Sequence, residues 1–374
     1  MSEWKKVKLG EICDISAGGD RPLLVSEKKT NICQVPIYSN GIDNQGLYGY
    51  TDIEKIKGGT ITITGRGANA GTVFYRKTAY YPIIRLLSLV PNKEVIDSQY
   101  LYYLIKDRTF LSTGSAQPQI TVPNISDYVI CYNTNLAIQD RIANILSRYD
   151  SLIENYQKQI KLLEEAAQRL YKEWFVNLRF PGHENTKIVD GVPEGWEKKR
   201  IGDIVEYFDK QRKPLSSMQR MSMDKVYPYY GAATLMDYVD NYLFDGIYLL
   251  LGEDGTVITP DNYPVLQYVW GKFWVNNHAH VLRGKNNIST EFLYAMFKEM
   301  PIADVVTGAA QPKISQGRLS EKKVLMPPKE LILKWSNITK SYFDSYRNLS
   351  DKIRHLTEAR DRLLPKLMSG EIAV

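Results

Sequence analysis

The sequence TGSAQPQI at residues 113–120 returns as TGAAQPKI at residues 307–314, a displacement of 194 residues (307 minus 113). Other markers recur at nearly the same distance. Trp4 and Trp196, for example, each precede a short run of the form Leu/Ile-Gly-Glu/Asp-Ile. Because a period near half the chain length is too long for a solenoid repeat, the chain is expected to contain two copies of one domain-sized unit.

The overall composition is that of a globular protein with room for two or three domains. The chain has 374 residues, of which 44% are apolar and 24% charged. A formal net charge of +6 favours an anionic partner, but composition alone does not decide for DNA or RNA. Tyrosine is abundant, which suits surfaces that stack on bases, although strands also favour tyrosine.

The cysteines and the terminal sequence bear on the cellular compartment. Cys13, Cys33 and Cys131 are odd in number and form no C-x-x-C pair, so they indicate neither a disulfide framework nor a thiolate metal site. The N-terminal residues have no apolar signal core, and no stretch of roughly 18 apolar residues occurs. We therefore expect a cytoplasmic protein that is neither exported nor membrane-spanning.

The sequence pattern of each copy predicts a mixture of helices and strands. Short apolar runs broken by Gly, Pro, Asn and Asp predict strands and turns, such as GGTITITG at residues 58–65 and GIYLLLG at residues 246–252. One helix is expected in each copy, at residues 98–106 and residues 290–298. Each unit is therefore expected to be mixed α and β.

After each copy the pattern changes to that of a long helix. Residues 136–175 contain no Gly or Pro, and their apolar positions step by three and four. The two predicted seams consist of Ile153, Tyr156, Ile160, Leu163, Ala167 and Leu170, and of Tyr346, Leu349, Ile353, Leu356, Leu363 and Leu367. A single helix of this kind is more often a core helix, whereas two matched seams in one chain favour a coiled coil.

The order unit, helix, unit, helix requires antiparallel helices if the equivalent halves are related by a pseudo-twofold axis. A helix of about 40 residues at ~1.5 Å per residue is on the order of 60 Å long, so the pair is expected to act as a spacer. The expected fold class is α+β, with two pseudo-repeated mixed α/β units held apart by two long antiparallel helices that form a coiled coil. The expected boundaries are 1–135 for the first unit, 136–180 for its helix, 181–195 for a linker, 196–328 for the second unit and 329–374 for the C-terminal helix.

Three long motifs resemble a known family. EEAAQRLYKEWFVNLRFPG (residues 164–182), PEGWEKKRIGDI (residues 193–204) and RDRLLPKLMSGEI (residues 360–372) are similar to the specificity subunit of type I restriction-modification enzymes. The resemblance covers essentially the whole chain. It implies that the two units are target recognition domains, each reading one half of a split DNA sequence, and that the helical pair sets the gap between the halves.

The resemblance also implies a set of partners. Two modification subunits would methylate an adenine in each half-site with S-adenosylmethionine. Two restriction subunits, which use ATP and Mg, would translocate and cleave unmethylated DNA. The specificity subunit itself would perform no chemistry and bind no cofactor or metal.

The motifs of the chain agree with a non-catalytic role. The N-P-P-F/Y and D-P-P-Y/W motifs of adenine methyltransferases are missing, the nearest tetrapeptide being MPPK at residues 326–329, and no Walker A pattern occurs. His278 and His280 lack a third metal ligand nearby in the sequence, so we interpret them as strand residues on one face. The alternatives are a stand-alone methyltransferase or nuclease with built-in recognition domains, and a scaffold that binds peptide or sugar.

Residues shared by both copies cannot distinguish two different half-sites, so we expect them to contact phosphates or to shape a common loop. The candidates are Gln117 and Gln311 in the repeated motif, together with Arg21 and Lys213, each of which precedes a proline. The alternative interpretations are a buried turn for the glutamines and a solvated surface for the basic pair.

Discriminating residues are expected where matched loops diverge, because Arg pairs with guanine and Asn or Gln with adenine in the major groove. The candidates are Arg66, Asn69 and Gln119 in the first copy, and Lys210, Gln211, Arg212, Asn276, Asn277 and Lys313 in the second. Where the first copy has a basic Gly-rich turn, the second has the acidic residues 252–255. These carboxylates would either accept from cytosine or cap the turn, and we favour the cap.

Overall fold

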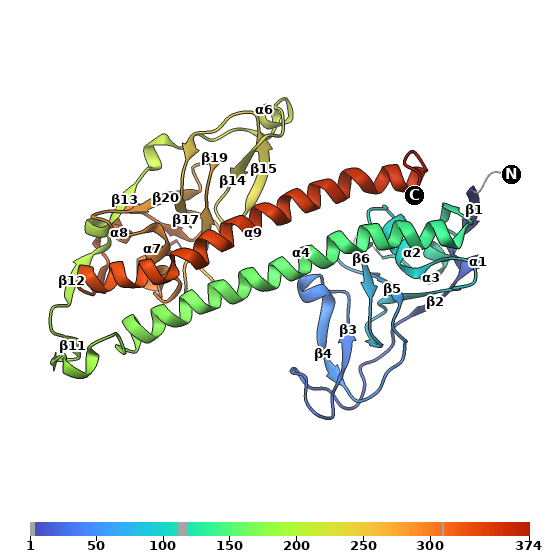
Figure 1. Ribbon diagram of the computed structural model, residues 1–374, viewed down its shortest axis with the longest axis horizontal. Coiled ribbons are helices and arrows are strands. Elements are labelled where there is room, and N and C mark those ends of the chain that lie inside the picture. The colour runs from blue at the N-terminus through green and yellow to red at the C-terminus, as the bar shows by residue number, and fades with distance from the viewer. Residues whose placement is uncertain (1–3, 111–118, 309) are drawn as a thin grey trace. The chain divides into compact units, whose positions relative to one another are not determined.

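The computed structural model describes residues 4–110, 119–308 and 310–374. Its contacts divide the chain into two compact units, a first unit of residues 1–155 and 353–374 and a second unit of residues 156–352. The two long helices, α4 (Leu136–Tyr171) and α9 (Lys329–Ser369), each contribute residues to both units (Figure 1). No helix in the described part of the chain is both long enough and apolar enough to cross a membrane.

The described residues of the first unit form three small sheets. Strand β1 (Trp4–Lys8) pairs with β9 (Val129–Asn133). A four-stranded sheet has the order β2 (Cys13–Ala17), β8 (Leu87–Pro91), β5 (Thr60–Ile63), β6 (Val73–Arg76). A three-stranded sheet has the order β4 (Leu47–Thr51), β3 (Val35–Tyr38), β7 (Tyr81–Pro82). The helices of this unit, apart from the long ones, are α1 (Leu9–Ile12), α2 (Ser98–Ile105), α3 (Val122–Ser126) and the 3-10 helix η1 (Asp43–Gly46).

The second unit repeats this plan. Strand β12 (Glu197–Arg200) pairs with β23 (Lys323–Met326). One four-stranded sheet has the order β13 (Val205–Tyr207), β20 (Ala279–Gly284), β17 (Tyr248–Gly252), β18 (Leu266–Val269). The other has the order β15 (Leu235–Val239), β14 (Tyr227–Tyr230), β19 (Lys272–Val275), β16 (Phe244–Asp245). The matching helices are α5 (Ile201–Ile204), α7 (Thr290–Lys298) and α8 (Gln316–Glu321).

Several smaller elements complete the second unit. The two-stranded pairs are β10 (Ile188–Val189) with β11 (Val192–Pro193), and β21 (Val306–Thr307) with β22 (Lys313–Ile314). The short helices are α6 (Ser217–Met221), a π-helical turn η2 (Lys172–Val176) at the end of α4, and the 3-10 helices η3 (His183–Asn185), η4 (Asp209–Gln211) and η5 (Ala303–Val305). Helix α6 has no counterpart in the described part of the first unit.

Strand register shows that the two units are copies residue by residue. In the first sheet Ile61 pairs with Leu89 and Ile63 with Leu87, and in the second Leu249 pairs with Leu282 and Leu251 with His280. The parallel pairs correspond as well, because β3 runs beside β7 as β14 runs beside β19. The expectation of two repeated mixed α/β units is therefore confirmed.

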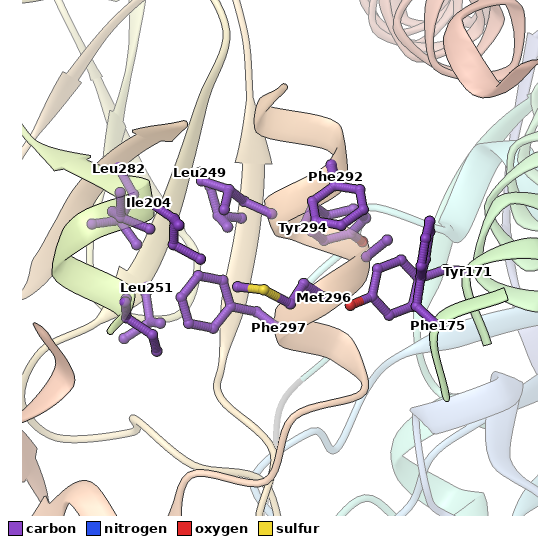
Figure 2. Packing of buried hydrophobic residues seen from close by; sticks show 14 of the residues in the cluster. Tyr171, Phe175, Ile204, Leu249, Leu251, Leu282, Phe292, Tyr294, Met296 and Phe297 are labelled. Carbon is purple, nitrogen blue, oxygen red and sulfur yellow. The ribbon is translucent and has the colours of Figure 1, made fainter. Parts of the chain in front are cut away.

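The helix predicted in each copy packs its apolar face into the core of its unit. Helix α7 spans the nine residues expected, and its N-cap Ser289 accepts from the backbone N–H of Phe292 at 3.1 Å. Figure 2 shows Phe297 beside Leu251 of β17, and Phe292 facing Tyr171 and Phe175 from the end of α4. In the first unit α2 is capped by Asp97 and ends one residue earlier than expected. In each unit the predicted helix thus packs on one four-stranded sheet, α2 on the sheet that contains β5 and β6 and α7 on the sheet that contains β17, β18 and β20.

The two long helices run antiparallel within the second unit. The Lys352 ammonium lies 5.8 Å from the ring centroid of Tyr156, and the rings of Trp335 and Tyr171 lie 6.0 Å apart. Residue numbers therefore rise along α4 as they fall along the facing part of α9. In the first unit Asp150 of α4 accepts from Arg360 of α9 at 2.6 Å. All twelve residues of the predicted seams are buried or half-buried, and none is exposed.

Candidate functional site

A basic pocket opens on the first unit beside the end of the four-stranded sheet. Its volume is about 350 Å³, and the residues lining it include the three arginines Arg21, Arg66 and Arg85, together with Asp20 and Tyr48. All three arginines are exposed. Within the described part of the chain, the guanidinium groups of Arg21 and Arg85 have no ion-pair or hydrogen-bond partner. The pocket therefore presents positive charge and free donors to solvent.

The loop that carries Arg21 is held close to the strand β7 by a glycine. A Cβ atom on Gly18 would lie 2.7 Å from the carbonyl carbon of Pro82, so a side chain cannot be accommodated there without moving the backbone. This close approach lets the Gly18 and Gly19 carbonyls accept from the N–H groups of Arg85 and Ile84 at 2.8 and 2.9 Å. The positions of Arg21 and Arg85 are thereby coupled through the backbone.

Arg66 is held at the pocket by a second predicted residue. A β-bridge joins Arg66 to Gln119. The amide oxygen of Gln119, turned toward the guanidinium, accepts from Arg66 Nε at 2.7 Å and from Nη2 at 2.9 Å. Asn69 is exposed in the same Gly-rich turn, where its carbonyl accepts from the Thr72 hydroxyl at 2.9 Å. The three residues predicted to discriminate bases in the first copy therefore belong to one surface turn and its neighbour.

The equivalent place in the second unit holds a network of charged side chains that are half-buried around the buried His280. Arg212, only 12% exposed, donates from Nη1 to Glu253 at 2.6 Å and to the Ala279 carbonyl at 2.7 Å. His280 Nδ1 faces the Asp209 carboxylate at 2.6 Å, and its Nε2 faces the Ile314 carbonyl at 2.8 Å. Both ring nitrogens of His280 therefore have an oxygen atom within hydrogen-bond distance.

This network corrects three of the expectations from sequence. His280 does have carboxylate neighbours, because Asp209, Glu253 and His280 place ligand atoms within 4.8 Å of one another. Arg212 lies against the same carboxylates, however, so these residues fit an ion-pair network better than a cation site. His278 lies before β20 rather than in it, and it pairs with Asp254. Glu253 pairs with Arg212, so its favoured interpretation as a turn cap is wrong.

The other second-copy candidates lie at different depths around this network. Lys313 is half-exposed, 3.6 Å from Glu253 Oε1, and forms a β-bridge with Asp254. Asn277 is exposed, and its carbonyl accepts from Arg212 at 3.4 Å. Asn276 is buried, and its Oδ1 accepts from the His278 N–H at 2.8 Å, which favours a structural role in the turn. The remaining exposed candidates are Lys210, Gln211, Lys213 and Gln311.

Gln117 and Arg85 remain to be placed, the first as a candidate from the sequence and the second as a pocket residue that was not a candidate. Gln117 lies outside the described residues. Arg85 was missed, because it belongs neither to the repeated motif nor to the divergent Gly-rich turn. Strand pairing brings Arg85 to the pocket. Leu87 at the start of β8 pairs with Ile63 at the end of β5, so Arg85, which precedes β8, lies near Arg66, which follows β5. A sequence signal for this residue would have required the register of β5 and β8.

Comparison with known proteins identifies the family. The profile described as type I restriction modification DNA specificity domain matches residues 1–165 and 193–334, which is more than half of the chain. The chain belongs to this family. It is a specificity subunit of type I restriction-modification systems, a DNA-recognition component rather than an enzyme, and it works with other subunits of such a system and with DNA.

Individual relatives agree with this assignment. The specificity subunit of the type I restriction enzyme MjaIX from Methanocaldococcus jannaschii is 27% identical over 344 residues, which cover 84% of this chain and 78% of the relative. A putative type I restriction enzyme specificity subunit from Haemophilus influenzae is 33% identical over 142 residues, or 38% of this chain and 35% of the relative. The crystal structure of the S subunit of a type I system from M. genitalium has the same fold, with a TM-score of 0.61 at 19% identity and coverage of 98% of this chain and 96% of that one.

Proposed function

We propose that this subunit reads a bipartite DNA sequence, with one half-site recognised by each unit. The observation that carries the proposal is one scaffold present twice with different charges at matching positions. The first unit presents Arg66 beside Gln119, and the second presents Asp254 beside Lys313, in equivalent β-bridges. Because base edges are read by hydrogen-bond patterns, different side chains on the same backbone suit different base sequences.

The contacts with DNA are assigned to two classes of residue. Arg21, Lys213 and the glutamines Gln117 and Gln311 are proposed to hold phosphates, since they are shared by both copies. Base contacts are proposed for Arg66, Asn69 and Gln119 in the first unit. In the second unit they are proposed for the exposed or half-exposed Lys210, Gln211, Asn277 and Lys313, with Arg212 shaping the loop from within.

The long helices are proposed to set the gap between the half-sites and to dock the partners. The partners would be two modification subunits, which carry S-adenosylmethionine and methylate adenine at N6, and two restriction subunits, which use ATP and Mg. Leu162, 64% exposed on α4 next to the seam residue Leu163, is an apolar side chain that a docked subunit would cover.

The test is a map of N6-methyladenine in cells that express this chain with its modification subunit. We expect methylation at one split sequence with two fixed halves and one gap length. Four residues inserted after Ala167 lengthen the helix by ~6 Å, so at ~3.4 Å per base pair this variant should keep both half-sites and prefer a gap longer by one or two base pairs. A continuous target would contradict the proposal, and an unchanged gap at full activity would contradict the role of the helices.

A further inference from the structure

The turn that connects β7 to β8 has an unusual backbone. Ile84 and Arg85 both have positive φ, 52° and 57°, and the N–H of Leu86 donates to the carbonyl of Ile83 at 3.1 Å. Two successive residues in the left-handed region between such partners form a type I′ turn. This turn type normally contains Gly, Asn or Asp at its two central positions.

The residues in this turn are poor choices for its geometry. A β-branched side chain is strained at positive φ, at a cost of order 1–3 kcal/mol. In the described part of the chain, the other consecutive pairs of non-glycine residues with positive φ begin with asparagine, namely Asn44–Gln45 and Asn286–Asn287. Stability alone would therefore favour asparagine at position 84, and the presence of isoleucine calls for another explanation.

The surrounding structure holds the turn in this conformation. The carbonyls of Gly19 and Gly18 accept from the N–H groups of Ile84 and Arg85, and the Asn40 side-chain amide donates to the Ile84 carbonyl at 2.5 Å. Asn40 also accepts from the N–H of Gly65, which directly precedes Arg66. The strained turn is thus fixed on both sides and tied to the turn that carries Arg66.

The side chains of Ile84 and Arg85 extend outward from the strained turn at the rim of the basic pocket. The Ile84 side chain is 52% exposed although it is apolar, and Arg85 is exposed as well. Both line the pocket together with Arg21 and Arg66. Strain held by the surrounding structure is typical of residues that contact a ligand.

We propose that the Ile84–Arg85 turn is a base-reading element of the first unit. The Arg85 guanidinium donates two hydrogen bonds to the acceptor edge of a guanine, and Ile84 packs against the neighbouring base. This inference rests on the proposed function, in which the first unit reads one half-site. A phosphate contact would require only a positive charge near the DNA, whereas a fixed and strained backbone sets the direction of the side chain, as a bidentate base contact requires.

The first experiment separates a base contact from a phosphate contact. Arg85→Lys, Arg85→Ala and the control Arg108→Ala, an exposed arginine elsewhere in the first unit, are each assembled with the modification subunit. Methylation is measured on duplexes in which each base pair of the mapped target is substituted in turn. Both Arg85 variants should methylate the target roughly 10- to 100-fold more slowly and lose discrimination at one base pair of the first half-site, because lysine lacks the bidentate geometry.

Full activity of Arg85→Lys would overturn base reading, as would an equal loss for Arg108→Ala. Failure of the proposed function has a different signature, because the wild-type complex itself would then show no sequence-dependent methylation.

The second experiment tests why isoleucine occupies the turn. Ile84→Asn relieves the strain, so the unfolding midpoint of the chain should rise by roughly 2–4 °C while methylation of the target falls or tolerates a second base at one position. Unchanged methylation would overturn the role of Ile84. A lower midpoint would overturn the strain on which the inference depends.

Discussion

The two units present different arrangements of charge at the same place in one scaffold. In the first unit Arg21, Arg66 and Arg85 surround a pocket that is open to solvent. In the second unit the Arg212 side chain is only 12% exposed and pairs with the carboxylates of Asp209 and Glu253. A duplicated fold can therefore keep its strand register and still differ in whether its arginines reach the solvent or pair with carboxylates inside the unit.

Strand register locates the substitutions that cause the reversal. Leu87 of the first unit and His280 of the second occupy the same position, because they pair with the equivalent residues Ile63 and Leu251. The residues that follow the central strands β5 and β17 also differ in charge. Glu253 follows β17, whereas the first unit has Gly65 at the equivalent position. Apolar and small residues at these positions offer the arginines of the first unit no carboxylate, whereas in the second unit Glu253 pairs with Arg212.

Removing the guanidinium of Arg212 should have the largest effect on stability among the variants that test this comparison. Arg212→Met leaves Glu253 and Asp209 without their main cationic partner, which destabilises the second unit by about 3 kcal/mol, near the lower end for a broken buried pair because Lys313 remains. The corresponding fall in unfolding temperature is roughly 6–12 °C. Calorimetry of the whole chain, with hydrogen exchange assigning the transition to residues 156–352, measures it.

Two matched variants control this experiment. Arg66→Met removes an exposed arginine from the first unit and should change stability by less than about 1 kcal/mol. Arg212→Met combined with Glu253→Gln removes both charges together and should cost less than Arg212→Met alone, because no uncompensated carboxylate remains between them. Equal losses for the single and double variants would mean that packing, and not charge, accounts for the effect.

Replacing the bridge residues of the first unit by those of the second should have an intermediate effect, which we expect on DNA recognition and not on stability. Arg66→Asp with Gln119→Lys transfers the pair of the second unit to the first, onto a β-bridge that both units share. Stability should change little, whereas methylation that depends on the first half-site should fall at least roughly tenfold, since an acidic group replaces a donor to base edges. Base-substituted duplexes check this, and a loss that extends to discrimination in the second half-site would contradict separate reading by the two units.

The sequence predicted what depends on local pattern and missed what depends on pairing. The sequence predicts the bounds of helix α7 to the residue because its apolar spacing lies within one short segment. The repeat, the mixed units and the long helices follow from the same kind of local signal. The contact of Asp209 with His280 joins residues 71 positions apart, and only the pairing of β13 with β20 brings them together. Arg85 was not predicted for the same reason, because only strand pairing brings it to the pocket. The burial of Asn276 could not be predicted from its residue type, since asparagine is usually exposed.

The smallest expected effect concerns an acidic residue that only the second unit possesses. Asp237 of β15 accepts from Lys225 Nζ at 3.0 Å, from the Tyr238 N–H at 2.8 Å and from Arg220 Nε at 3.0 Å. These contacts, the hydrogen bond from Lys225 foremost, lower the pKa of the Asp237 carboxyl to about 2. By strand register the first unit has Gly49 at this position, in the pair Ile37–Gly49 that matches Tyr229–Asp237.

The direction of the pH effect follows from the lowered pKa. Because the folded chain favours the charged carboxylate, Asp237 contributes stability that is fully present above the usual pKa of about 4 and is lost as the pH falls toward 2. The difference in unfolding temperature between the wild type and Asp237→Asn should therefore shrink between pH 5 and pH 2. An NMR titration of the Asp237 carboxyl carbon should give a midpoint near 2, whereas a midpoint near 4 would show that Lys225 and Arg220 do not hold this carboxylate in solution.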